Sequence, residues 1–416
     1  MRSNLSPVLG GAAPRVPGGR KTPRRTLRAG WALAGTALAF ASLYLGAGAL
    51  TPLLVVYRQE WDFPPSMLTL AFAAYALGFL VAALTLGSLS DHIGRRPVLI
   101  AALVVQLGSN VVFLVAPDVG WVLVGRIVQG VASGAATAAF TAAMVELAPP
   151  DRKRLAAILG SVSLTGGLAI GSLLAGLAIQ LTPAASTIVF VTLILLTVVG
   201  GLVVFASPET VDRTPGAIRS MIPNVAIPIA AGKEFAAVAP VVAAVWMLAG
   251  LSGGIAPSLV HSVFHLDSGL LNGVAGFIAP AVSAAIGLSF ARVDSRRAMT
   301  IGITAALIGA AGIIAGVLLG SIVVMIVGQA VAGVAFGASF TAALRLLVPL
   351  AGPNQRAGVV AAVYVVSYTA FGLPIIIEGQ LVGAIGVVPA VVGYTGLTML
   401  LVLVSLIARA RLRRSS

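Results

Sequence analysis

The stretch that decides the fold is Gly87-Ser88-Leu89-Ser90-Asp91-His92-Ile93-Gly94-Arg95-Arg96. It lies between two long apolar segments, 68–86 and 97–115. Two such segments joined by so short a polar stretch must turn back on each other at one face of a lipid bilayer. We therefore expect a tight loop between two membrane-spanning helices, where Asp91 and Arg95 pair at the surface.

Composition extends this interpretation to the whole chain. Of its 416 residues, 59% are hydrophobic and only 9% are charged, whereas a soluble protein carries roughly a quarter charged residues. Apolar runs recur that are long enough to cross ~30 Å of hydrocarbon as helices, and no alternating pattern indicates a β-barrel. We predict an all-α integral membrane protein with twelve transmembrane helices. The predicted spans are 31–57, 66–88, 97–116, 119–147, 155–180, 184–206, 236–260, 268–291, 298–319, 321–348, 357–382 and 388–408.

The positions of Lys and Arg predict the orientation of these helices. Of the 26 basic residues, 24 lie in the two tails and in alternate loops, and the exceptions are Arg58 and Arg126. Basic loops remain in the cytoplasm, so we expect both termini there, in a multi-pass protein of the cell inner membrane. The net charge of +14 therefore does not indicate nucleic-acid binding. Residues 1–30 are predicted to be a cytoplasmic tail; a signal peptide is the alternative, but the apolar segment 31–56 is too long for one.

The chain divides into two related halves. The longest internal connection, 207–235, contains four prolines and is predicted to be a cytoplasmic linker between six-helix bundles at 31–206 and 236–408, with a cytoplasmic tail at 409–416. A shift of 203 positions superimposes three separate regions of the first half on the second. Under that shift Gly125, Arg126, Gly130, Gly134 and Asp91 fall on Gly328, Gln329, Gly333, Gly337 and Asp294.

The stretch at 87–96 resembles the loop between helices 2 and 3 of the major facilitator superfamily, whose pattern is roughly G-x-x-x-D-x-x-G-R-R/K. The resemblance implies two pseudo-symmetric six-helix bundles. It also implies a latch that holds the halves together when the cavity faces outward. The alternative is that the arginines only enforce topology. The latch residues by this resemblance are Gly87, Asp91, Gly94, Arg95 and Arg96, with Glu146 at the end of the fourth span as a further member.

A charge inside the fourth span points to a cavity. Burying Arg126 in lipid costs roughly 2.5–3.5 kcal/mol or more, so its side chain must face protein or water, unless it reaches the outer headgroups. The sequence from Arg126 to Gly134 resembles the family's R-x-x-x-G-x-x-x-G motif, which is associated with proton coupling there. Gln129 and Ser133 share a helical face with Arg126, and we expect that face to form a cavity wall.

Glu378, in the eleventh span, lies one turn after Pro374. Burial favours the neutral form of a carboxyl group, so Glu378 is a candidate carrier of the coupling proton. The alternative is an acid at the outer boundary of the membrane.

The fifth span carries glycines at helical spacing, namely Gly167, Gly171 and Gly176. This segment is similar to the antiporter motif G-x-x-x-G-P-x-x-G-G of exporters in the superfamily. Ser172 replaces the proline of that motif and Ala175 replaces a glycine. Ordinary packing of small residues is the alternative.

Aromatic residues near the middle of three spans are candidates for a substrate cavity. They are Tyr44, Trp246, Tyr364 and Tyr368; lipid-facing or interhelical packing is the alternative. His261 and His265 lack an acid-rich partner nearby, and the chain has no cysteine, so we expect no metal site.

Together these features predict a secondary active transporter that works by alternating access. Few paired polar groups occur in the spans, which favours proton-coupled efflux of small hydrophobic or amphiphilic compounds over uptake of a small metabolite by a symporter. The absence of a P-loop or a catalytic triad spacing argues against an enzyme. We expect no cofactor, protons as coupling ion, a small-molecule substrate and the lipid bilayer as partners, and a monomer.

Overall fold

The computed structural model describes residues 27–415, so the predicted tail up to residue 26 lies outside the described residues. Within 27–415 every regular element is a helix, and twelve helices are long and apolar enough to cross a membrane. The predicted count of twelve is confirmed.

The spans of the first half are α1 (Ala29–Trp61), α2 (Pro65–Leu86), α4 (Arg95–Val115), α5 (Val119–Leu147), α6 (Lys153–Leu181) and α7 (Ala185–Ala206). Those of the second half are α9 (Ile229–Gly250), continued by a π-helical turn (Leu251–Ile255) and α10 (Ala256–Ser262), then α11 (Gly269–Ser289), α12 (Ser295–Leu318), α13 (Ile322–Leu347), α14 (Arg356–Ile385) and α15 (Val387–Ser415). Two short helices, α3 (Ser90–Ile93) and α8 (Ala217–Ser220), lie in the connections.

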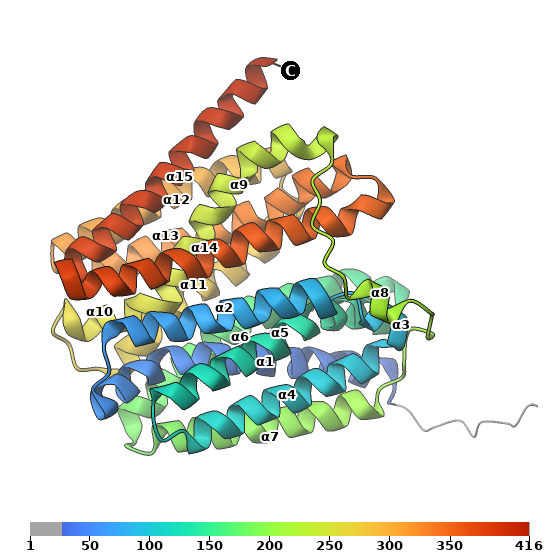
Figure 1. The fold of residues 1–416 in the computed structure, drawn as a ribbon, viewed down its shortest axis with the longest axis horizontal. Helices are drawn as coiled ribbons and strands as arrows, with labels where there is room; N and C mark the ends of the chain where they lie inside the picture. The colour runs from blue at the N-terminus through green and yellow to red at the C-terminus, as the bar shows by residue number, and fades with distance from the viewer. Residues whose placement is uncertain (1–26, 416) are drawn as a thin grey trace, which may run out of the picture.

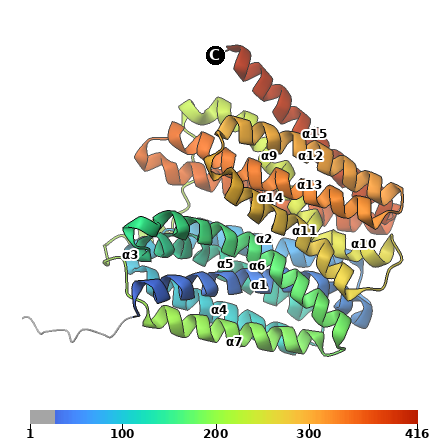
Figure 2. The same cartoon turned by 180° about the vertical axis from the view of Figure 1, so that it is seen from behind.

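The helices form two bodies, one from α1–α7 and one from α9–α15, which lie side by side (Figures 1 and 2). The packing pairs of the first body recur in the second: α2 on α5 corresponds to α11 on α13, α4 on α7 to α12 on α15, and α1 on α7 to α9 on α15. The bodies meet where α6 packs on α11 and α2 packs on α14. The predicted pseudo-symmetric pair of bundles is therefore confirmed.

The same symmetry appears at single residues. A Cβ atom on Gly134 would lie 3.0 Å from the carbonyl carbon of Phe79 in α2, and one on Gly337 would lie 2.7 Å from the carbonyl oxygen of Ser283 in α11. These two glycines are 203 positions apart. The offset found in the sequence thus reflects equivalent helix crossings, where small residues let two backbones approach closely.

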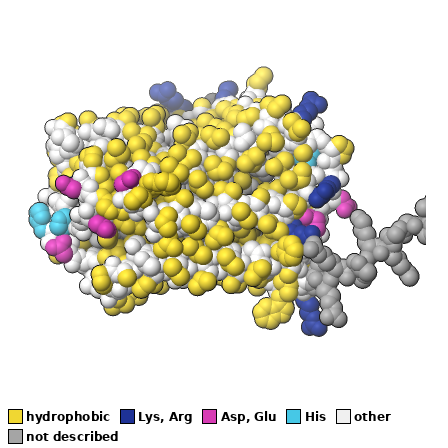
Figure 3. Space-filling view, turned by 60° about the horizontal axis from the view of Figure 1, so that its bottom comes forward, with side chains coloured by type: hydrophobic (Ala, Val, Ile, Leu, Met, Phe, Trp, Pro, Cys, Tyr) yellow, Lys and Arg dark blue, Asp and Glu magenta, His cyan; other side chains and the backbone are white. Residues whose placement is uncertain are grey.

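The two ends of the molecule differ in charge. We call the end that contains α3 and α8 the basic end, and the end that contains α10 the opposite end (Figure 1). Figure 3 shows hydrophobic side chains over most of the surface between them, with Asp, Glu and His but no Lys or Arg side chains visible at its left end, and Lys and Arg together with some Asp and Glu towards its right end.

Two helices extend further than the apolar pattern predicts. α9 begins at Ile229, inside the predicted linker, and α15 runs through the predicted tail to Ser415. Both extensions carry charges, which led the sequence analysis to end the spans there. A helix needs no lipid around it, however, and Arg409 Nη1 of α15 donates to Glu234 Oε1 of α9 at 3.1 Å. This ion pair stabilises the two extensions against each other.

Candidate functional site

Arg95, the first residue of α4, is the centre of an ion-pair cluster at the basic end. Its Nη2 donates to Glu146 Oε1 at 2.9 Å, its Nη1 donates to Ser90 Oγ at 2.7 Å, and Nη1 also contacts Asp91 Oδ1. The Arg95 side chain is 12% exposed, whereas those of Asp91 and Glu146 are 54% and 31% exposed. Gly94 precedes it at a φ of 101°, a conformation that glycine adopts readily. Of the six residues assigned to the latch, the structure thus brings together Asp91, Gly94, Arg95 and Glu146, whereas Gly87 lies against Ala83 of its own helix and the Arg96 side chain donates to Ser207 O.

Glu209 was not anticipated as a member of this cluster. Its Oε1 accepts the backbone N–H of Arg95 at 2.8 Å and its Oε2 accepts that of Arg96 at 3.1 Å. A carboxylate there satisfies free donors at the N-terminus of α4 and interacts favourably with the helix dipole. Next to it, Thr210 Oγ1 donates to Glu146 Oε2 at 2.5 Å. The one signal in the sequence was an acid three residues after the end of a span.

The cluster joins α3, α4, α5 and the start of the linker, and none of its hydrogen bonds reaches α9–α15 in the described part of the chain. It is therefore contained in the first body in this conformation. The linker itself bridges the bodies: Ser88 Oγ donates to Ser220 O at 2.8 Å, and Ala226 N donates to Gly358 O at 3.4 Å.

Replacing Glu209 with alanine is expected to lower the free energy of unfolding by about 1 kcal/mol, the usual cost of losing a helix N-cap. Asp212, three residues on, has no hydrogen bond in the described chain, so Asp212→Ala is a matched control. Thermal unfolding of the two purified variants measures the difference. Equal stability of both variants would contradict the capping role.

Arg126 lies inside the first body, 1% exposed. Its Nε donates to Ala71 O at 3.2 Å and its Nη1 donates to Gln129 Oε1 at 2.9 Å. The guanidinium carbon lies 4.7 Å from the ring centroid of Phe72 and 5.2 Å from that of Tyr75. Arg126 therefore faces protein rather than acyl chains. Among the described residues, dipoles and aromatic faces surround its charge, and no carboxylate pairs with it.

A central cavity lies between the two bodies and has an empty volume of about 930 Å³, including the space at its mouth. Its residues come from α1, α2, α5 and α6 of the first body and from α9, the π-helical turn, α11, α13 and α14 of the second. The lining includes Tyr44, Phe72, Tyr75, Arg126, Trp246, Phe336, Tyr368 and Phe371.

Three of the four predicted aromatic residues line this cavity, and Tyr364 does not. Tyr364 lies one turn nearer the basic end, where its ring packs 6.4 Å from Phe79 and 6.2 Å from Tyr368 between centroids. The predicted wall of α5 also differs from the expectation. Gln129 and Ser133 are fully buried and do not line the cavity. Of the three residues on this face of α5, Arg126 reaches the cavity.

At the opposite end the two bodies are closed on each other along a seam between α6 and α11. A Cβ atom on Gly176 would lie 2.5 Å from Gly273 Cα, and one on Gly269 would lie 2.8 Å from Gln180 N. Ser172 Oγ donates to Gly273 O across the same seam at 3.0 Å. The serine that replaces the motif's proline thus makes a bond between the bodies. Towards the basic end the bodies diverge (Figure 1).

The other glycines of the α6 motif have a different partner. Cβ atoms on Gly167 and Gly171 would lie 2.8 Å from Tyr44 Cβ and from the carbonyl carbon of Leu45, both in α1. These two positions hold α6 against its own body. Only Gly176 takes part in the contact between bodies.

Glu378 lies outside the central cavity. It lines a second, smaller pocket of about 350 Å³ at the opposite end, between the two bodies, with Arg58 of α1 and Thr69 of α2. Glu378 is 2% exposed, and its Oε1 has no hydrogen-bond partner in the described chain. It shares this pocket with Arg58 without an ion pair in the described residues. Both residues are unusual in the sequence, but their proximity could not be predicted from it.

The family model described as Major Facilitator Superfamily matches residues 36–377. Among curated proteins, "Solute carrier family 22 member 2" of Oryctolagus cuniculus is 29% identical over 136 residues, 33% of this chain and 23% of that protein. "Quinolone resistance protein NorA" of Staphylococcus aureus is 25% identical over 111 residues, 27% of this chain and 29% of that protein. The alignments thus span less than a third of these relatives.

Solved structures resemble the whole fold. "Crystal Structure of A Bacterial Homolog to Human Lysosomal Transporter, Spinster, in Inward-facing And Unoccupied Conformation" has a TM-score of 0.68 at 16% identity, over 92% of this chain and 96% of that one. "Crystal structure of the human organic anion transporter MFSD10 (TETRAN)" has a TM-score of 0.63 at 18% identity, over 92% and 100%. At such identities the likeness concerns the fold.

Proposed function

Because the chain belongs to the major facilitator superfamily and is therefore a membrane transporter, we propose that it exports small hydrophobic or amphiphilic compounds by proton-coupled alternating access. The observation that carries this proposal is the largely apolar cavity between two pseudo-symmetric bodies, with a closed seam on one side of it. Rocking of the two bodies around such a cavity would expose it first to one side of the membrane and then to the other.

The basic end is the cytoplasmic end in this proposal, since loops rich in Lys and Arg stay in the cytoplasm. The conformation described here is then inward-facing, with the seam between α6 and α11 as the closed outer gate. The cluster around Arg95 would reach the second body only in the outward-facing form, which agrees with its confinement to the first body here.

The proton carrier in this proposal is Glu378. A charged carboxylate that is 2% exposed and has an unpartnered oxygen is costly, so it is well suited to bind and release a proton. Opening of the outer gate would separate the walls of its pocket and expose it to the outside. Arg58 lines the same pocket from the other body and would attract the carboxylate when the proton leaves.

Direction is the property to test first. Purified protein in liposomes is given a pH gradient of either sign, and a permanently charged aromatic dye is added outside. Antiport predicts accumulation when the interior is acidic, because protons leave as dye enters. A symporter predicts accumulation when the exterior is acidic, and that result would overturn the export proposal. Protein-free liposomes correct for passive entry.

A further inference from the structure

We propose that the substrate of the central cavity is an amphiphilic organic anion, held by Arg126 at its charged end and by an aromatic cluster at its apolar end. This inference rests on the proposed function and gives its substrate class. It follows from which charges line the cavity and where they lie.

The charge that lines the cavity has one sign. Arg126 is the only charged residue among those that line the cavity, and no Asp or Glu is among them. Glu378 lies in the separate pocket at the opposite end. A cationic compound would therefore enter a site that contains a cation and no counter-charge. An anion would supply the opposite charge that Arg126 lacks.

Arg126 and Trp246 each have a hydrogen-bond donor that is not used. Arg126 uses Nε and Nη1 for Ala71 O and Gln129 Oε1, which leaves Nη2 without an acceptor in residues 27–415. Trp246 is 9% exposed, and its Nε1 is buried without a hydrogen-bond partner in the same described range. A buried donor such as this indole N–H costs free energy unless it is paired. Both residues line the cavity, so the acceptor oxygens of a ligand could pair with Arg126 Nη2 directly, and with the indole N–H after the Trp246 ring turns towards them.

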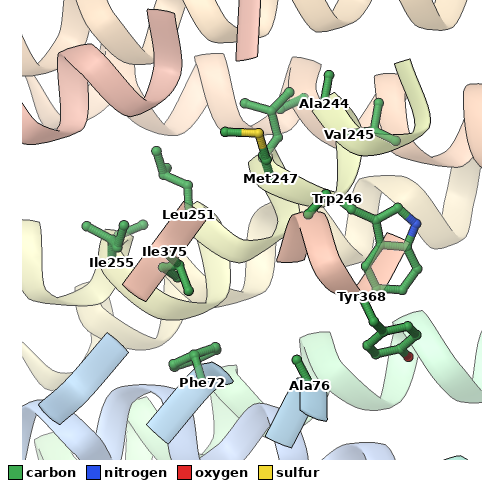
Figure 4. Close-up of a cluster of buried hydrophobic side chains, with 14 of the residues drawn as sticks. Phe72, Ala76, Ala244, Val245, Trp246, Met247, Leu251, Ile255, Tyr368 and Ile375 are labelled. Carbon is green, nitrogen blue, oxygen red and sulfur yellow. The ribbon is translucent and has the colours of Figure 1, made fainter. Parts of the chain in front are cut away.

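Aromatic rings around Trp246 would hold the apolar end of the ligand. Trp246 is surrounded by rings of the second body, with centroids 5.2 Å away in Phe336, 4.7 Å in Tyr368 and 5.9 Å in Phe371. Figure 4 shows Trp246 and Tyr368 next to each other, on the side that faces Phe72 and Ala76 of α2. Aromatic rings in these arrangements stabilise one another and also a further ring placed among them.

The two poles lie on different bodies. Arg126 and its neighbours Phe72 and Tyr75 belong to α5 and α2, whereas Trp246, Phe336 and Phe371 belong to α9, α13 and α14. A molecule with an anionic group and an aromatic ring would contact both bodies at once. It would therefore stabilise an arrangement in which they are close. Neither an anion nor a hydrocarbon alone would do so.

The test is equilibrium binding to the purified full chain in phosphatidylcholine nanodiscs, with three radiolabelled probes of one ring system. They are naphthalene-2-sulfonate, neutral naphthalene-2-sulfonamide and the cation (naphthalen-2-ylmethyl)trimethylammonium. We expect the sulfonate to bind at least tenfold more tightly than the other two. Arg126→Gln is expected to remove this preference. Equal or tighter binding of the cation, or a preference that survives in Arg126→Gln, would overturn the inference.

Two further variants keep the test decisive if Arg126→Gln does not fold. Trp246→Phe keeps a ring but removes the donor, and is expected to weaken sulfonate binding about threefold or more without weakening cation binding. Phe336→Leu removes a ring but no charge or donor, and is expected to weaken all three probes alike. If Trp246→Phe weakens them all alike as well, the donor role is refuted.

A comparison of binding with transport also tests the substrate class and proton-coupled export separately. Selective binding of the sulfonate without accumulation under either pH gradient would refute proton-coupled export and leave the substrate class standing. Gradient-driven accumulation of the cation alone would refute the substrate class and leave export standing.

Discussion

Replacing Gly176 with leucine is expected to abolish transport while the protein still inserts and folds. Gly176 and Gly273 meet with almost no space between their backbones: a Cβ atom on Gly176 would lie 2.5 Å from Gly273 Cα and 2.6 Å from Gly269 O. Because neither of these contacts involves a flexible side chain, the seam can accept leucine only by opening. Overpacking of this kind costs about 3 kcal/mol, which would shift the equilibrium between the two forms roughly a hundredfold.

Accessibility of the cavity measures that shift directly. The chain contains no cysteine, so a single cysteine at Thr51, which lines the cavity beside the seam, gives a clean signal. In Gly176→Leu this cysteine is expected to react much faster with an impermeant maleimide added from the opposite end. Gly166→Leu is the control on the same helix, because a Cβ atom there meets only Val162 Cγ1, at 3.4 Å. Unchanged labelling and normal transport in Gly176→Leu would show that the seam is no gate.

Replacing Glu378 with glutamine is expected to reduce pH-driven accumulation to background while exchange of labelled for unlabelled substrate continues. Glutamine has nearly the same shape but cannot release a proton, so movement of substrate would no longer be tied to movement of protons. The experiment measures pH-driven accumulation and substrate exchange in the same liposomes and compares the two. Glu60→Gln, on an exposed residue of α1 near the same end, serves as control.

Two outcomes of that experiment speak against the assignment of Glu378. Wild-type accumulation in Glu378→Gln would mean that another group carries the proton. Equal loss of accumulation and exchange would mean that Glu378 supports the pocket rather than the coupling.

Much of the fold could be predicted because lipid imposes simple rules on sequence. The length of the apolar segments predicted the twelve spans, and the offset of 203 positions indicated equivalent helix crossings in the two bodies. The cost of a buried charge correctly placed Arg126 against protein. The bounds of α9 and α15 were less predictable, because the ion pair between Glu234 and Arg409 joins helices that are distant in sequence.

The site was harder to predict for a related reason. Spacing on one helix shows which residues share a face but not what faces them. It therefore grouped Tyr364 with Tyr368, although only Tyr368 reaches the cavity. It marked Gly176 as a packing residue without revealing that its partner lies in the other body. Glu209 was missed because an irregular linker has no periodicity from which a contact with α4 could be inferred.

The seam between α6 and α11 is lined by glycines, which have no side chain, and this has a thermodynamic consequence. A gate built from leucines would lose side-chain conformational entropy worth roughly 0.5–1 kcal/mol per residue each time it closed. A rise in temperature would then favour the open form. Gly176, Gly269 and Gly273 have no rotamers to lose. The balance between the two forms is therefore expected to change little as the cell warms or cools.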